Sequence, residues 1–331
     1  MPDVHRVVYV LERQPRGTDL GVPRKKRPVA MQTPVPMKEG RPLLAAAWMA
    51  GTLVSFSLLA VATRELTVHA KLDLFQMIFL RSLIALAFLL PVIAVAKGPS
   101  FATRHPFLHF FRNTFSFIGS YAWYFGIANL PLANVFALEF TAPVWVALLA
   151  MLFLGERMTA TRALAIFFGV VGTLVILRPG LAGFEWESLV VLGAALSFSC
   201  SMVATKGLTR SDSVLQVVVW MSLVQGLLAV GPAMASWQPV GAAAWAWIVL
   251  MGAASLSAHL CLTRALSLAD ATVVVPMDFL RVPLIAIVGF LTYGEHIDIW
   301  VLVGTLVIFL GSYNSVRREQ GATRSPVGIK P

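Results

Sequence analysis

Two carboxylates stand inside apolar segments that are long enough to cross a lipid bilayer. The first segment, residues 133–157, carries Glu139, and the second, residues 272–296, carries Asp278. Their offset of 139 residues (278 minus 139) is also the offset between the Gly-Glu pairs that close the two segments. A charged side chain in hydrocarbon costs several kcal/mol unless it faces a partner or a cavity. A carboxylate at the same place in two copies of one pattern therefore predicts a role in ligand or proton binding.

Three arginines and a histidine add charge to segments of the same kind. At about 1.5 Å per helical residue, Arg81 lies roughly 11 Å and Glu139 roughly 9 Å below one membrane surface, so the sequence predicts an outer polar cluster in which these two side chains pair. The remaining residues lie roughly 8–15 Å from the opposite surface and form a predicted inner cluster: Arg112, His259, Asp278 and Arg281.

Structural interpretations of these charges stay open beside the functional ones. Arg81 and Arg112 could extend their guanidinium groups toward a membrane surface. Asp278 and Arg281 are three residues apart, so they could neutralise one another on one helix face. Glu139 has no such local partner, and we predict that it takes up a proton when Arg81 withdraws from it.

Aromatic residues of the spans are candidates to stack on a flat ligand. The candidates are Trp123, Tyr124, Trp145 and Trp220, although aromatic residues near span ends also form the interfacial belts of membrane proteins. His259 is equally compatible with a ligand contact and with a hydrogen-bonded packing role. Glu156 and Glu295 stand at span ends and are expected to anchor loops.

The composition is that of a membrane protein. Of the 331 residues, 58% are hydrophobic and 13% are charged, and the mean hydropathy is +0.78. Soluble domains carry about a quarter charged residues. The two cysteines, Cys200 and Cys261, fall inside predicted spans, so neither a disulfide nor a metal site nor another cofactor is expected. The sequence predicts an all-α integral membrane protein in a lipid bilayer.

Ten apolar segments follow one another with short connections. The predicted spans are 43–63, 74–96, 107–128, 133–154, 160–178, 188–207, 214–235, 244–264, 271–293 and 297–315. Five spans per half is an odd number, so the second half must enter the membrane in the opposite orientation. The predicted fold is ten transmembrane helices as two inverted five-helix repeats, a construction of secondary transporters. The predicted domains are a disordered basic tail (1–41), two repeats (42–180 and 186–316) and a second tail (317–331).

The distribution of Lys and Arg predicts the orientation. With the amino terminus inside, the inner loops and span ends carry Lys97, Arg104, Arg157, Arg162, Lys206, Arg210 and Arg264, and the outer ones carry Arg64, Lys71 and Arg178. Cytoplasmic loops are enriched in such residues, so both termini are predicted to be cytoplasmic. The net charge of +10 follows from this pattern and requires no nucleic-acid partner, because the basic residues are scattered through loops.

Four short motifs add a family resemblance. They are Arg81-Ser82, Leu154-Gly155-Glu156-Arg157, Arg178-Pro179-Gly180 and Tyr293-Gly294-Glu295. With the two five-span repeats, they make residues 43–316 similar to EamA-type members of the drug/metabolite transporter superfamily. The resemblance implies a bacterial inner-membrane carrier whose cavity lies between the halves, with the fifth and tenth helices peripheral. It leaves the substrate open among amino acids, nucleobases, vitamins, S-adenosylmethionine and drugs.

The prolines of the two carboxylate-bearing spans do not coincide. The fourth span contains Pro143, whereas the ninth contains Pro276 and Pro283. We therefore expect helix breaks that are out of strict register between the halves, and two gates that are mechanically unequal.

The function predicted is secondary transport of a small organic metabolite by alternating access. An enzyme is not expected, because the chain has no HExxH, GxSxG or GxxxxGKS motif. Resemblance favours an amino-acid-like substrate, with S-adenosylmethionine as one example. The alternative is a receptor or accessory subunit that binds a ligand without moving it, and the sequence also leaves a homodimer open.

Overall fold

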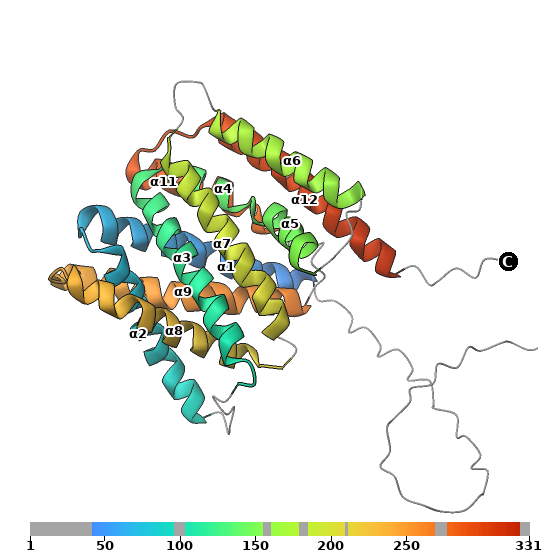
Figure 1. Ribbon diagram of the computed structural model, residues 1–331. Helices are drawn as coiled ribbons and strands as arrows, with labels where there is room; N and C mark the ends of the chain where they lie inside the picture. Colours follow the sequence, from blue (N-terminus) through green and yellow to red (C-terminus); the bar gives the residue numbers. More distant parts are fainter. Residues whose placement is uncertain are drawn as a thin grey trace, which may run out of the picture. The chain divides into compact units, whose positions relative to one another are not determined.

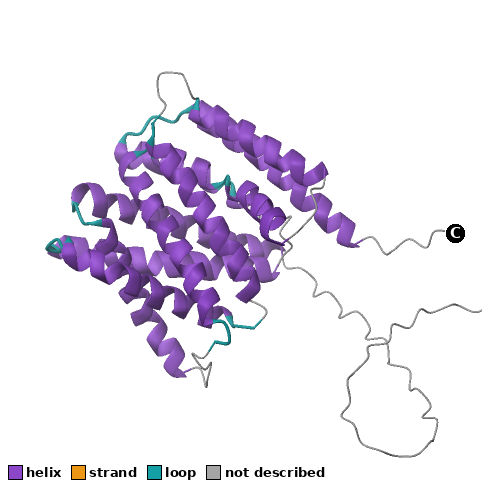
Figure 2. Ribbon diagram, in the orientation of Figure 1, coloured by secondary structure: helices purple, strands orange, loops and turns teal. Residues whose placement is uncertain are grey.

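The computed structural model describes residues 42–95, 103–154, 160–178, 185–208, 211–268 and 277–324. Within these ranges all regular secondary structure is helical (Figure 2). The helices are α1 (Pro42–Arg64), η1 (Glu65–His69), α2 (Leu74–Val95), α3 (Pro106–Asn129), α4 (Leu132–Glu139), α5 (Ala142–Leu154), α6 (Ala160–Leu177), α7 (Glu187–Leu208), α8 (Val214–Ala235), α9 (Ala242–Leu268), α11 (Arg281–Tyr293) and α12 (Ile299–Arg324). The predicted tail 1–41 lies outside the described residues.

Long apolar helices confirm the prediction of an all-α integral membrane protein. Five described segments are long and apolar enough to cross a bilayer: Leu43–His69, Leu74–Pro91, Glu187–Thr205, Leu215–Ala235 and Ala242–Leu262. Shorter apolar helices cover Leu132–Val146, Ala163–Leu177, Arg281–Tyr293 and Ile299–Asn314. The last helix continues to Arg324, past the predicted span end at 315.

The fourth and ninth spans are both interrupted, and the interruptions are in register. The chain leaves the helix at Phe140–Thr141 between α4 and α5, and at Phe279–Leu280 before α11. Both residues of the second break lie 139 positions after those of the first, so the expectation that the breaks are out of register was wrong. A proline ring clashes with the carbonyl four residues earlier. Pro143 therefore disturbs the carbonyl of residue 139, and Pro283 disturbs that of residue 279. In the repeat alignment these two carbonyls are one position apart. Both helices consequently end beside a carboxylate.

Helix packing repeats between the two halves. α1 packs on α9, and the counterparts of these helices in the other half, α7 and α3, pack on one another in the same way. α2 packs on its own counterpart α8, and α6 packs on its own counterpart α12. α4 packs on α11, the counterpart of α5. A hydrogen bond of 3.0 Å between the hydroxyls of Ser55 and Ser257 joins α1 to α9. This exchange of partners is what a twofold relation between two five-helix repeats requires.

α6 and α12 form a close pair, which Figure 1 shows side by side. Their backbones touch at two glycines: a Cβ on Gly172 would lie 2.6 Å from the carbonyl oxygen of Gly304, and a Cβ on Gly304 would lie 2.6 Å from that of Gly172. Small residues allow such close approach in membrane helices, where packing replaces the hydrophobic effect as the driving force.

Candidate substrate-binding site

Arg281 stands where the two interrupted spans meet. It is the first residue of α11, and its side chain is 5% exposed. Nη2 lies 3.0 Å from Oδ2 of Asp278, and Nη1 lies 3.7 Å from Oε1 of Glu139, the last residue of α4. The repeat counterpart of Arg281 is Ala142, because 281 minus 139 is 142. One arginine therefore serves the carboxylates of both repeats.

Phenylalanine rings surround this guanidinium. Its central carbon lies 4.3 Å from the ring centre of Phe56, 4.9 Å from that of Phe140 and 5.4 Å from that of Phe136. Phe140 stacks on Phe279, its own repeat counterpart, with ring centres 4.3 Å apart and planes inclined by 21°. The helix breaks thus place equivalent residues of the two repeats in contact, and an aromatic ring face favours a nearby cation.

Glu139 makes its second contact with an aromatic residue of α3. The indole Nε1 of Trp123 donates a hydrogen bond of 2.9 Å to Oε2 of Glu139. Arg81, the partner that the sequence predicted, lies elsewhere: its Nη2 donates to Oε1 of Gln225 on α8, and its guanidinium lies 5.6 Å from the ring centre of Tyr124. The predicted pair of Arg81 and Glu139 was therefore wrong, because α2 packs on α8 and α9 whereas α4 packs on α11.

The Arg81 contacts continue into α3. Nε2 of Gln225 donates to Oγ of Ser116 at 2.9 Å, and the rings of Tyr124 and Trp123 lie 5.9 Å apart. This links Arg81 to the group around Arg281. We call the combined set the core polar network. Its members are Arg81, Ser116, Trp123, Tyr124, Glu139, Gln225, Asp278 and Arg281.

The predicted inner cluster is only partly assembled. Asp278 and Arg281 are paired as predicted. Arg112 donates to Oγ1 of Thr205 at 3.0 Å and to Oδ1 of Asn113 at 2.6 Å. His259 has an exposed side chain, meets the ring of Phe56 edge-on at 5.9 Å, and is within electrostatic range of Arg81, Arg112 and Arg281.

Another predicted aromatic residue lies just past the first helix break. Nε1 of Trp145 donates to Oγ1 of Thr141 at 3.2 Å, one turn earlier on the chain. Among the described residues, no hydrogen bond, ion pair or ring contact joins Trp145 to Arg281. Tyr124, by contrast, is 1% exposed and belongs to the network.

Gln225 and Ser116 are network members that the sequence analysis did not identify, whereas Trp123 was among its aromatic candidates. On α3 the buried polar and aromatic residues recur at helical spacing: Asn113, Ser116, Ser120 and Trp123. Spacings of three and four residues place side chains on one helix face. This stripe in an otherwise apolar span is the sequence signal that identifies the α3 side of the site, whereas Gln225 stands as an isolated polar residue in α8.

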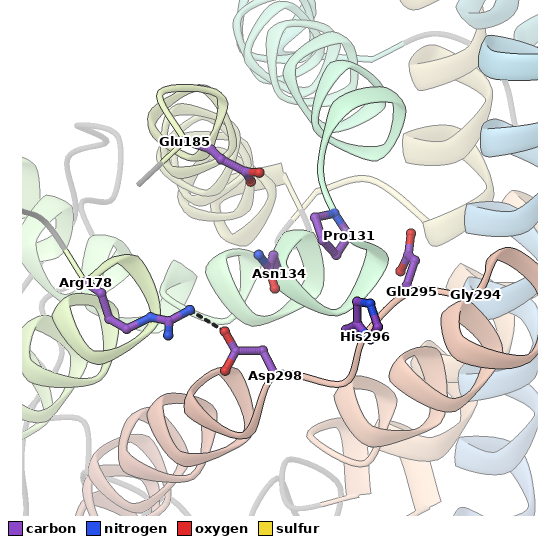
Figure 3. A pocket seen from close by; sticks show the side chains of 8 residues that line it. All are labelled: Pro131, Asn134, Arg178, Glu185, Gly294, Glu295, His296 and Asp298. Atoms are coloured by element: carbon purple, nitrogen blue, oxygen red, sulfur yellow. Dashed lines mark hydrogen bonds and ion pairs between the residues drawn. The ribbon is translucent and has the colours of Figure 1, made fainter. Parts of the chain in front are cut away.

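Two carboxylates outside the spans have shifted pKa values. A hydrogen bond from Thr103, reinforced by one from His109, lowers the pKa of Asp212, whose side chain is 4% exposed. Burial and the neighbouring Glu187 raise the pKa of Glu185. Glu185 lines a pocket of about 410 Å³ at the end of the bundle where α4 begins, together with Pro131, Asn134, Arg178, Gly294, Glu295, His296 and Asp298 (Figure 3).

The fold and the site together define a multi-pass helical carrier built from two repeats around a buried polar network. Comparison with known families specifies the class further. The family model described as "EamA-like transporter family" matches residues 43–178 and again residues 185–317. The chain belongs to this family, and it is a membrane transporter of a small-molecule metabolite rather than a receptor or an enzyme.

Relatives extend over nearly the whole chain. A riboflavin transporter of Rhizobium johnstonii is 31% identical over 299 residues, which cover 89% of this chain and 98% of that protein. An S-adenosylmethionine uptake transporter of Rickettsia bellii is 25% identical over 275 residues, 83% of this chain and 94% of that protein. A protein crystal structure covers 85% of this chain and 99% of its own, with 18% identity and a TM-score of 0.57, and it shares the fold.

Proposed function

We propose that the protein is a secondary transporter of a flavin, with riboflavin as its cargo, and that it works by alternating access in the bacterial inner membrane with both termini in the cytoplasm. The observation that carries this proposal is the relation at 31% identity to a riboflavin transporter over 98% of that protein's length. The absence of a GxxxxGKS motif from the sequence agrees with transport that ATP does not drive directly.

The hydrogen-bonding groups of the core polar network support a ligand rich in acceptors. Among the described members of this network, the buried donors without a hydrogen-bond partner are Nε and Nη1 of Arg281 and Oη of Tyr124, which can also accept. Oδ1 of Asp278 is a buried acceptor without a partner. The isoalloxazine ring of a flavin offers two carbonyl oxygens, ring nitrogens that accept, and one imide N–H that donates. Such a ligand matches several donors and one acceptor, and buried polar groups are costly to leave unpaired.

Aromatic side chains supply the second requirement of a flavin. The rings of Phe56, Phe136, Phe140 and Trp123 lie around Arg281 and Glu139. Ligand sites in proteins are commonly apolar and aromatic, with few polar groups that fix orientation. The side chains of Glu139 and Asp278 are each 21% exposed, which agrees with ligand entry.

Counterflow in proteoliposomes tests the proposal. Vesicles loaded with unlabelled riboflavin should accumulate labelled riboflavin from outside, and Arg281→Met should abolish the accumulation. Exposed Arg104 provides the matched control, since Arg104→Met removes an arginine outside the network and should leave counterflow unchanged. Absence of riboflavin counterflow from correctly inserted wild-type protein would refute the flavin assignment.

S-adenosylmethionine is the second candidate substrate. A full-length relative carries that substrate in its name, and two carboxylates beside one arginine suit a ligand with both a cationic centre and a carboxylate. Labelled S-adenosylmethionine in the same vesicles separates the two candidates. Counterflow of S-adenosylmethionine without counterflow of riboflavin would replace the first assignment by the second.

A further inference from the structure

A second polar group lies at the end of the bundle where α4 begins. Arg64, the last residue of α1, donates from Nη2 to the carbonyl oxygen of Leu130 at 2.5 Å. The same Nη2 lies 3.0 Å from Oε1 of Glu295, and Oε2 of Glu295 accepts a hydrogen bond of 2.8 Å from the backbone N–H of Leu132. Arg64 and Glu295 are each 13% exposed. We call these four residues the Glu295 junction.

The junction holds the main chain of the α3–α4 turn rather than its side chains. Leu132 is the first residue of α4, and the first N–H groups of a helix have no partner inside the helix. A carboxylate placed there satisfies one of them and is favoured by the helix dipole. Arg64 and the turn belong to the first repeat and Glu295 to the second, so the contacts of Glu295 form only while the two repeats are in contact at this end.

Two glycines bring Glu295 to this position. Gly294 has a φ of +66°, a left-handed conformation that ends α11 and reverses the chain, and glycine adopts it without strain. The N–H of Glu295 then bonds back to the carbonyl of Gly289 at 3.2 Å. The Glu295 carboxylate lies against the bare Cα of Gly289, where a methyl group would overlap it.

Helix α4 connects this junction to the core polar network. It has eight residues, and at about 1.5 Å per residue it is about 12 Å long. Its first residue, Leu132, is held by Glu295, and its last residue, Glu139, is paired with Arg281. Arg281 begins α11, and Glu295 follows α11 by two residues. The two ends of α4 are therefore tied to the two ends of α11.

We propose that the Glu295 junction closes the transport path at this end of the bundle, which the predicted topology places at the periplasm, and that α4 transmits ligand binding at Arg281 to the junction. The proposal rests on the proposed transport by alternating access, but not on the identity of the substrate. Opening this end requires the two repeats to separate there, and separation breaks the contacts of Glu295 with Arg64 and Leu132. The pocket of about 410 Å³ that Glu295 lines lies on the same turn, beside Pro131 and Asn134 (Figure 3).

A neighbouring ion pair provides a matched control. Arg178 binds Asp298 at the edge of the same pocket, which Figure 3 shows as a dashed contact. This pair joins the residue after α6 to the residue before α12, two helices that already pack on one another. Its side chains are 34% and 30% exposed, so its removal should affect the junction little.

Thiol labelling measures the closure directly. The reporter is Ala137→Cys, on the fully buried middle of α4, in a background with Cys200→Ser and Cys261→Ala. A membrane-impermeant maleimide added outside right-side-out vesicles should label this cysteine slowly. Glu295→Gln keeps an acceptor for Leu132 but loses the charge, and it should raise the labelling rate about tenfold, since hydrogen bonds to charged groups contribute about that factor or more to an equilibrium.

Gly289→Ala is the second variant, because it displaces the carboxylate without changing any charge and the displaced group is the end of a flexible side chain. It should also accelerate labelling, whereas Asp298→Asn should not. Labelling at the parent rate in both Glu295→Gln and Gly289→Ala would overturn the proposal, and so would equal acceleration by Asp298→Asn. Acceleration only from the opposite membrane face would also overturn the assigned side.

Added riboflavin separates this proposal from the flavin assignment. Riboflavin should change the labelling rate of the reporter in the parent, and Glu139→Gln should weaken that response because it loosens the α4 contact with Arg281. If riboflavin has no effect while Glu295→Gln still accelerates labelling, the flavin assignment fails and the closure by Glu295 stands. If riboflavin acts equally with and without Glu139→Gln, the coupling role of α4 is refuted.

Discussion

Replacing Arg281 by methionine should destabilise the protein strongly, because it leaves two carboxylates near one another without a counter-ion. Removing one partner of a fully buried ion pair costs about 3–5 kcal/mol. The Arg281 side chain is 5% exposed, but both carboxylates are 21% exposed, so we expect the lower end of that range. At about 2–4 °C per kcal/mol for a large domain, a loss of about 3 kcal/mol lowers the melting temperature by roughly 6–12 °C.

Asp278 and Glu139 should contribute unequally to this loss of stability. Nη2 of Arg281 is 3.0 Å from Asp278, and Nη1 is 3.7 Å from Glu139. With an effective dielectric constant of about 20, the attractions are about 5.5 and about 4.5 kcal/mol before desolvation is subtracted. The coupling of Arg281 to Asp278 should therefore exceed its coupling to Glu139 by about 1 kcal/mol.

A double-mutant cycle measures this difference. The variants are Arg281→Met, Asp278→Asn, Glu139→Gln and the two double variants, and the readout is the melting temperature of detergent-solubilised protein by fluorescence-detected size exclusion. Exposed Arg104→Met is the control and should not shift it. A coupling to Glu139 equal to or larger than that to Asp278 would refute the reasoning, as would an Arg281→Met variant that melts like the wild type.

Four further outcomes are expected. Glu139→Gln should remove the pH dependence of uptake while exchange of substrate for substrate survives, and a wild-type pH profile would exclude proton coupling through this residue. Arg81→Ala should abolish transport with the protein still inserted, and Arg81→Lys should retain little, because an ammonium group lacks the planar fork of guanidinium. Full activity of the alanine variant would show that the contact of Arg81 with Gln225 is not needed for transport. The lowered pKa of Asp212 stabilises the fold at pH values above about 3.9, the pKa of this group in the unfolded chain, and this contribution is lost as the pH falls through the folded pKa. Asp212→Asn should therefore lower the melting temperature at pH 7 and not at pH values below the folded pKa. Equal shifts of the melting temperature at the two pH values would contradict this. A cysteine at Gln238 should react with an impermeant thiol reagent from the periplasm and one at Ser211 should not, and the reverse pattern would invert the topology.

Element positions could be predicted closely from the sequence because hydrophobic length determines where a span begins and ends. The seventh span was expected at 214–235, and the corresponding helix α8 runs from Val214 to Ala235. The equivalence of Glu139 and Asp278 was also predictable, since internal repetition relates two positions without any knowledge of packing. Both carboxylates contact one arginine in the structure.

The sequence was a poorer guide to which side chains pair, because the depth of a residue in the membrane does not determine which neighbour it meets. Arg81 and Glu139 were expected at similar depths below one surface, but the rotation of each helix and the choice of neighbours decide which side chains meet. Arg81 meets Gln225 because α2 packs on α8. Glu295 was expected only to anchor a loop, and its contact with the backbone of Leu132 depends on a chain reversal at Gly294 that places residues distant in sequence together.

The glycine contact between α6 and α12 has a consequence for biosynthesis. Leu177 leaves the ribosome well before Ile299, and the 122 residues between them (299 minus 177) take on the order of ten seconds to synthesise. During that interval the α6 surface at Gly172 lacks the helix that packs against it. The first half of the protein must therefore remain in the membrane as a partly assembled intermediate, and a chain that terminates before Ile299 leaves this surface permanently available to other membrane helices and to quality-control proteases.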